Sequence, residues 1–150
     1  MDTKRIALIA SIVGSGIVFL DATIVNVALP SIRASLHGGL AVQQWVVEAY
    51  LLTLASLLLV GGSLGDLFGR RRVFAIGVVA FGVFSLLCAV APSSGWLIVG
   101  RAVQGIAGAL LVPSTLALIM DTFDADERPG AIGTWTAYTG VATVIGPRGV

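Results

Sequence analysis

Residues 61–74 read GGSLGDLFGRRRVF and lie between two long apolar runs. The segment combines one aspartate and three consecutive arginines with glycines at four positions: Asp66, Arg70, Arg71, Arg72, Gly61, Gly62, Gly65 and Gly69. Charged residues make up only 11% of the 150 residues, so this cluster marks the boundary between two apolar segments. The nature of those segments decides the fold class.

The composition is that of a membrane protein. Apolar residues make up 57% of the chain and the mean hydropathy is +0.99, whereas a soluble domain carries about 25% charged residues. The 19 glycines also suit a helical bundle in lipid, where small residues let helices approach and every backbone group bonds internally. The sequence therefore predicts an all-α membrane protein.

Several other classes of protein are not expected. The net charge of +1 gives no basic surface for nucleic acid. Cys88 is the single cysteine, and we expect it to pack as a small apolar side chain. His37 lies in a glycine-flanked loop without a metal-ligand spacing, and no catalytic motif stands out, so neither an enzyme nor a metal or cofactor site is expected.

A membrane-spanning helix needs about 20 mostly apolar residues. Five segments are predicted to span, at about residues 6–30, 45–64, 73–91, 96–120 and 131–150. Lys4 and Arg5 before the first apolar run resemble the start of a signal peptide, but the apolar character continues to Leu29, which is too long for a signal core. The first segment is therefore predicted to stay as a helix.

The distribution of Lys and Arg predicts the orientation, because cytoplasmic loops carry an excess of them. One side of the predicted bundle holds Lys4, Arg5, Arg70, Arg71, Arg72 and Arg128. The other side holds only Arg33. We expect a multi-pass protein of the cell membrane with a cytoplasmic N-terminus.

The glycines of the opening segment are spaced for helix contact. Gly61, Gly65 and Gly69 follow one another at intervals of four, as do Gly105 and Ala109 in the fourth segment. Asp66 is expected to accept from a neighbouring helix N-terminus or to pair with the arginines across the turn. From the residues alone, a conformational latch and a plain loop that fixes topology stay equally open.

Three ionisable residues fall inside predicted spans: Asp21, Glu48 and Arg101. A charge at the centre of a spanning helix costs about 2.5–3.5 kcal/mol, so such residues usually face a cavity and have a role there. Counted from the helix ends, all three lie in the outer half of the bundle. We favour Asp21 with Arg101 as a proton-coupled pair, because small movements of the arginine change the proton affinity of the acid. The alternative is an ion pair that only fixes packing.

The remaining polar candidates surround this pair. Thr23, Asn26 and Gln104 are expected to supply neutral hydrogen bonds. Glu48 is one turn from Trp45, a residue typical of the membrane interface, so it is either wetted there or a second proton site.

Four motifs, in order, resemble those of the major facilitator superfamily. Residues 62–71 (GSLGDLFGRR) are similar to the loop between its second and third helices. Residues 20–32 (LDATIVNVALPSI), 97–114 (LIVGRAVQGIAGALLVPS) and 140–147 (GVATVIGP) resemble the first-, fourth- and fifth-helix motifs of its drug:proton antiporters, especially the fourteen-helix branch. The resemblance implies export of hydrophobic or cationic small molecules across a lipid bilayer, driven by the proton gradient.

The resemblance also implies residue roles. A latch that stabilises the outward-facing state would be formed by Gly62, Gly65, Asp66, Gly69, Arg70 and Arg71. Arg101 would serve proton coupling, and Gly146 with Pro147 would bend the fifth helix and reduce leak.

Two features depart from the family pattern. Leu67 stands where many members have a basic residue, and Arg148 follows Gly146-Pro147 where the pattern leads to paired glycines. Family transporters have twelve or fourteen helices in two halves around a midplane site. Residues 1–150 are therefore expected to form a partial N-terminal bundle whose C-terminal half is absent or supplied by a partner. The alternative is a truncated, non-transporting membrane fragment or assembly partner.

Overall fold

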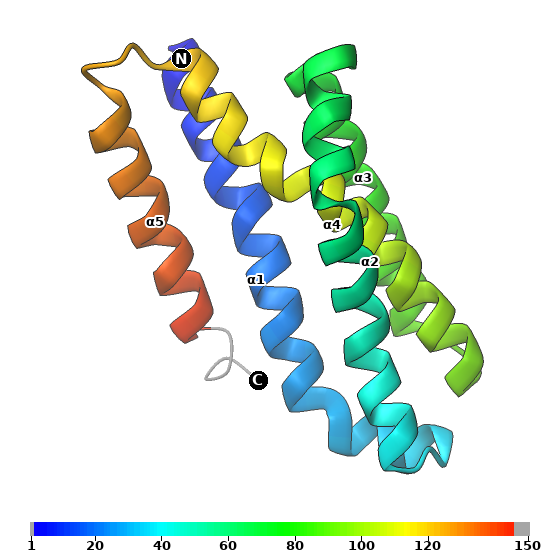
Figure 1. Ribbon diagram of the computed structural model, residues 1–150. Helices are drawn as coiled ribbons and strands as arrows, with labels where there is room; N and C mark the ends of the chain where they lie inside the picture. The colour runs from blue at the N-terminus through cyan, green and yellow to red at the C-terminus, as the bar shows by residue number, and fades with distance from the viewer. Residues whose placement is uncertain (1, 146–150) are drawn as a thin grey trace.

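The computed structural model describes residues 2–145, which form five α-helices joined by short turns (Figure 1). The helices are α1 (Thr3–Leu36), α2 (Leu40–Phe68), α3 (Arg70–Ala89), α4 (Ser94–Thr122) and α5 (Arg128–Ile145). Successive helices run in opposite directions, so the turns alternate between the two ends of the bundle (Figure 1). No strand occurs within residues 2–145, and the predicted all-α fold is confirmed.

Four of these helices, α1 to α4, are long and apolar enough to cross a membrane. The described part of α5 is not among them, because its 18 residues include Arg128 and several threonines. The fifth span was predicted to run to residue 150, and residues 146–150 lie outside the described residues.

The helices extend beyond the predicted spans at most of their ends. The first was predicted to end at Pro30, but α1 continues through this proline to Leu36. A membrane helix tolerates an internal proline where neighbouring groups satisfy the freed carbonyls. α1 ends instead at His37, whose φ of 55° is the left-handed conformation typical of a helix C-terminus.

The turn between α2 and α3 consists of a single residue, Gly69. Its φ of 98° is strained for any residue with a side chain, and its N–H donates to the Gly65 carbonyl at 3.1 Å. Gly69 was predicted to take part in helix contact, but a side chain there would meet no atom within 4 Å. Glycine is needed here for the turn rather than for packing.

The centre of the bundle is α4, which packs against α1, α2 and α3. A methyl group at Gly61 of α2 would overlap the carbonyl of Ala109 in α4, so these two backbones are in direct contact. A methyl group at Gly105 would in turn overlap the side chain of Thr53. The close helix approach predicted from the spacing of Gly61, Gly105 and Ala109 is confirmed.

Charged side chains gather at the end of the bundle where α1 begins. Lys4 donates to Glu127 and, at 3.4 Å, to Asp124, which ties α1 to the turn between α4 and α5. At the opposite end, the Ser94 hydroxyl donates to the Leu36 carbonyl at 3.4 Å. We refer to the first as the charged end. The grouping of Lys4 with the Arg70 turn and Arg128, predicted from loop charges, matches this arrangement.

Candidate functional site

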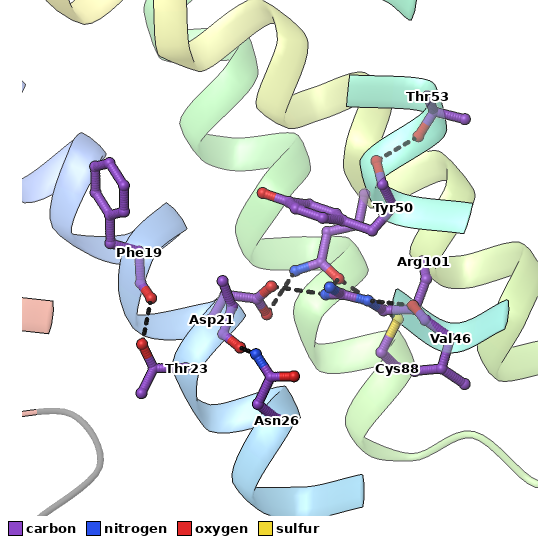
Figure 2. A network of polar contacts seen from close by, with 11 residues as sticks. Phe19, Asp21, Thr23, Asn26, Val46, Tyr50, Thr53, Cys88 and Arg101 are labelled. Carbon is purple, nitrogen blue, oxygen red and sulfur yellow. Dashed lines mark hydrogen bonds and ion pairs between the residues drawn. The ribbon is translucent and has the colours of Figure 1, made fainter. Parts of the chain in front are cut away.

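Asp21, Arg101 and Gln104 form a closed polar ring between α1 and α4 (Figure 2). The Arg101 Nη1 donates to Asp21 Oδ2 at 2.6 Å and to Gln104 Oε1 at 2.8 Å. The Gln104 Nε2 donates to Asp21 Oδ1 at 3.0 Å. Both carboxylate oxygens of Asp21 are therefore bonded, and the predicted Asp21–Arg101 pair is present.

Local helical geometry explains how these residues meet. Arg101 and Gln104 are three positions apart on α4, so they share one face of that helix. At a rise of about 1.5 Å per residue, Asp21 lies about 27 Å from the start of α1 and Arg101 about 32 Å from the end of α4. Because the two helices are antiparallel, both residues reach the same level, in the half of the bundle remote from the charged end.

Helix α2 completes the surroundings of Arg101. The Arg101 Nε donates to the Val46 carbonyl at 3.2 Å, and the guanidinium carbon lies 4.3 Å from the centre of the Tyr50 ring. Arg101 is only 2% exposed and Gln104 is fully buried. A buried charge is tolerated when it is paired and hydrogen-bonded, and these contacts supply both conditions.

A cavity of about 410 Å³ adjoins the ring on the side away from the charged end. Its polar lining comes from Asp21, Arg101, Gln104, Ser31, Ser35, Ser85 and Cys88. The rest of its wall is apolar, from residues such as Ile24, Val25 and Leu97. A mostly apolar cavity with a few convergent polar groups suits an amphipathic small molecule.

Three other candidates predicted from the sequence do not join the ring. The side chains of Thr23 and Asn26 donate to carbonyls of their own helix, those of Phe19 at 3.0 Å and Ala22 at 2.9 Å (Figure 2). Asn26 and Glu48 are exposed. Of the neutral partners expected for Asp21, the structure brings only Gln104 to it. A role for Asn26 or Glu48 in the pathway stays a prediction.

The contributions of α2 and α3 to the site were not predicted from the sequence. Nothing in the pattern distinguished Tyr50 or the Val46 carbonyl, because their roles depend on how α2 packs against α4. Cys88 was expected to pack as a small apolar residue, but it also lines the cavity, with its Sγ 3.8 Å from Gln104 Oε1.

A second polar cluster surrounds the turn at Gly69. Arg70 pairs with Asp66 at 3.1 Å across the turn. Of the two arrangements predicted for Asp66, this is the pairing with an arginine across the turn. Arg70 also pairs with Asp121 of α4 and donates to the Ala117 carbonyl at 3.4 Å. Asp121 was not predicted as a partner, although its position in the acidic run of residues 121–127 placed it on the same side of the bundle.

The other latch candidates lie around this cluster. Gly65 is buried, Gly62 is partly buried beside Pro113, and Arg71 is exposed. Gly146 and Pro147, predicted to bend the fifth helix, lie outside the described residues. Within residues 2–145, no group of three His, Cys, Asp or Glu side chains is placed to hold a metal ion.

Comparison with known proteins agrees with this architecture. The family model described as the Major Facilitator Superfamily matches residues 11–148. The chain is 43% identical over 145 residues to the probable actinorhodin transporter of Streptomyces coelicolor, which covers 96% of this chain and 25% of that protein. It is 42% identical over 146 residues to the multidrug resistance protein Stp of Mycobacterium tuberculosis, covering 97% of this chain and 27% of that protein.

A third relative is the tetracenomycin C resistance and export protein of Streptomyces glaucescens. It is 43% identical over 140 residues, which cover 93% of this chain and 26% of that protein. The chain thus spans about a quarter of the length of the curated relatives it matches. With the family model matching nearly the whole chain and four helices suited to a bilayer, this multi-pass membrane protein belongs to the major facilitator superfamily.

Proposed function

We propose that the protein takes part in the export of hydrophobic or cationic small molecules across the cell membrane, in exchange for protons. The observation that carries the proposal is the Asp21–Arg101–Gln104 ring, buried between apolar helices and open to a cavity of about 410 Å³. The names of the relatives, which describe antibiotic export and multidrug resistance, support the same substrate class. The activity is transport, with the proton gradient as its energy source and no cofactor.

The ring offers a simple means of proton exchange. Ionised Asp21 holds both Arg101 and Gln104, and protonation removes the charge that attracts Arg101. Arg101 then keeps its contacts with Gln104, the Val46 carbonyl and the Tyr50 ring, all of them on α4 or α2. Protonation therefore loosens α1 from α4. A cationic substrate in the cavity would compete with the proton for the same carboxylate.

We also propose that the charged end faces the cytoplasm. The excess of Lys and Arg at that end supports this orientation, because basic residues are retained on the cytoplasmic side. The Asp21 ring then lies toward the outer face of the membrane. Lys4 is the single lysine of the chain, so an amine reagent that cannot cross membranes tests the orientation. In inside-out membrane vesicles, whose cytoplasmic face is turned outward, the reagent should label Lys4.

The proposed function predicts the effect of replacing Asp21. Inside-out membrane vesicles from cells expressing the protein should accumulate an amphipathic dye when a proton gradient is imposed. Asp21→Asn should lower this uptake at least about tenfold, because an amide cannot exchange a proton at neutral pH. Asp21→Glu should retain part of it. Asp126→Asn, an identical change at an exposed site in the α4–α5 turn, is the matched control and should behave as wild type.

Two results would contradict the proposal. Gradient-driven uptake that persists unchanged in Asp21→Asn would exclude this carboxylate as the coupling group. Wild-type vesicles that contain correctly inserted protein but show no uptake of any amphipathic dye would favour the alternative, a non-transporting membrane component.

A further inference from the structure

We infer that Tyr50 is a positioning residue for Arg101, and that the face of its ring, not its hydroxyl, fixes the guanidinium against Asp21. The inference rests on the proposed function only for its consequence in transport. The geometry itself comes from α2, the helix that adds no charged group to the ring.

The position of Tyr50 is well defined. It is 3% exposed and belongs to a buried apolar cluster with Val18, Phe81 and Leu111. Its ring meets that of Phe81 edge to face, with the ring centres 6.4 Å apart. The ring therefore has little freedom to move.

One face of this fixed ring lies against Arg101. The guanidinium carbon is 4.3 Å from the ring centre, within the range in which a cation is attracted by an aromatic face (Figure 2). One helical turn before Tyr50 on α2, the Val46 carbonyl accepts a hydrogen bond from Arg101 Nε at 3.2 Å. These two groups of α2 hold the arginine through its Nε and the face of its guanidinium, while its Nη1 donates to Asp21 and Gln104.

The hydroxyl of Tyr50, unlike its ring, makes no contact that would orient Arg101. The Tyr50 oxygen is buried, and within the described residues it has no hydrogen-bond partner. A buried hydroxyl without a partner lowers stability and does not orient a neighbour. The aromatic face is thus the part of Tyr50 that acts on the site, and phenylalanine should replace it.

Each of the three helices packed around Arg101 places one titratable side chain near it. They are Asp21 from α1, Tyr50 from α2 and Cys88 from α3, with Arg101 itself on α4. Losing the ring face would let Arg101 move away from Asp21 and would release Gln104, whose Oε1 lies 3.8 Å from the Cys88 sulfur. Cys88 is the single cysteine of this sequence and lines the cavity, so its reactivity reports the state of the site.

The test compares Tyr50→Leu with Tyr50→Phe in the protein reconstituted into lipid nanodiscs. The rate of alkylation of Cys88 by a small maleimide is followed by mass spectrometry of the peptide that contains it. Tyr50→Leu should raise the rate at least about fivefold, because a cation–π contact in a dry site is worth more than the roughly 1 kcal/mol of an exposed one. Tyr50→Phe should react at the wild-type rate.

Phe81→Leu is the matched control for loss of packing. It removes an aromatic ring of the same buried cluster, on the same helix as Cys88, without touching Arg101. Its alkylation rate should rise less than that of Tyr50→Leu, because the Tyr50 ring face stays beside Arg101 and only one of its packing neighbours becomes smaller. Equal rates in Tyr50→Leu and Phe81→Leu would overturn the inference, because ordinary packing would then explain both. Fast alkylation in Tyr50→Phe would also overturn it, because the hydroxyl would then be the acting group.

A second readout connects the inference with transport. The pH at half-maximal dye uptake should shift in Tyr50→Leu and stay at the wild-type value in Tyr50→Phe. If wild-type protein shows no uptake, the proposed function fails, but the alkylation rates still decide whether Tyr50 positions Arg101. If uptake is proton-driven and its pH profile is the same in both variants, the inference fails and the proposed function stands.

Discussion

Two arginines of this bundle have similar partners but different surroundings. Arg70 pairs with two carboxylates at the charged end, where its side chain is 31% exposed and both partners are more than half exposed. Such pairs contribute only about 0–1 kcal/mol to stability. Arg101 is buried, and removing one partner from a buried pair costs about 3–5 kcal/mol. Arg70 is therefore suited to a contact that forms and breaks readily, whereas the Arg101 pair is costly to break while Asp21 is ionised.

The two partners of Arg70 have separable roles. Asp66 is four positions away, and its pair stays within the α2–α3 turn, whereas Asp121 connects that turn to α4. We predict that Asp121→Asn slows gradient-driven uptake severalfold with little change in thermal stability, because the pair is exposed. The measurement is initial uptake at matched protein levels in the membrane.

The control for this prediction is the same substitution in an Arg70→Gln background. There, Asp121→Asn should have no further effect, because the arginine that it pairs with is absent. An effect of equal size in both backgrounds would show that Asp121 acts through another group, and the latch would not depend on its pair with Arg70.

Individual side chains were predictable from the sequence where a strong physical cost singled them out. Asp21 and Arg101 were found because charges are rare within spans, and counting residues from the helix ends placed both in the outer half of the bundle. Tyr50 was not identified as a partner of Arg101, nor Asp121 as a partner of Arg70. An aromatic residue in an apolar helix, and an acid in an acidic loop, are ordinary until packing sets them against a particular arginine.

Among the helices, α4 is the one against which α1, α2 and α3 pack. Small residues allow this: Gly77 of α3 lies against the Leu111 backbone of α4, as Gly61 of α2 lies against Ala109. The predicted spacing of glycines identified the α2–α4 contact. It did not show which glycine serves a turn, because Gly69 has the same spacing and a different function.

Gly61→Ala should lower stability, because its methyl group would overlap the Ala109 carbonyl and force α2 away from α4. Overpacking of this kind costs about 1–3 kcal/mol. Gly82→Ala is the matched control, since a methyl group at that helical position meets no atom within 4 Å. The midpoint of thermal unfolding in detergent should fall for the first variant only. Equal midpoints would mean that the two helices are not in direct contact at Gly61.

The boundaries of the helices were harder to predict than their number. Hydropathy locates the part of a helix that crosses lipid, but helical hydrogen bonding continues beyond it until a residue such as His37 or Gly69 leaves the helical conformation. Proline usually breaks helices in water, but α1 passes through Pro30, where the first span was predicted to end.

At the scale of the whole molecule, two polar sites lie at different levels of one apolar bundle. The Arg70 cluster lies at the charged end, and the Asp21 ring lies about 27–32 Å away along the helices. Helices α1 and α4 contribute to the structure at both levels, through Lys4 and Asp121 at one and through Asp21 and Arg101 at the other. In the proposed cycle, a change in the protonation of Asp21 would act on a helix that also reaches the charged end.

The most direct test of this account is to count protons released when a substrate binds. Purified protein in weakly buffered detergent solution is titrated with an amphipathic cation such as tetraphenylphosphonium, and the pH change is recorded. The starting pH is set near the midpoint of proton binding to the protein, where Asp21 would be partly protonated. The account predicts that wild-type protein and Asp126→Asn release protons as the cation binds, whereas Asp21→Asn binds the cation and releases none. Equal proton release by wild type and Asp21→Asn would contradict it.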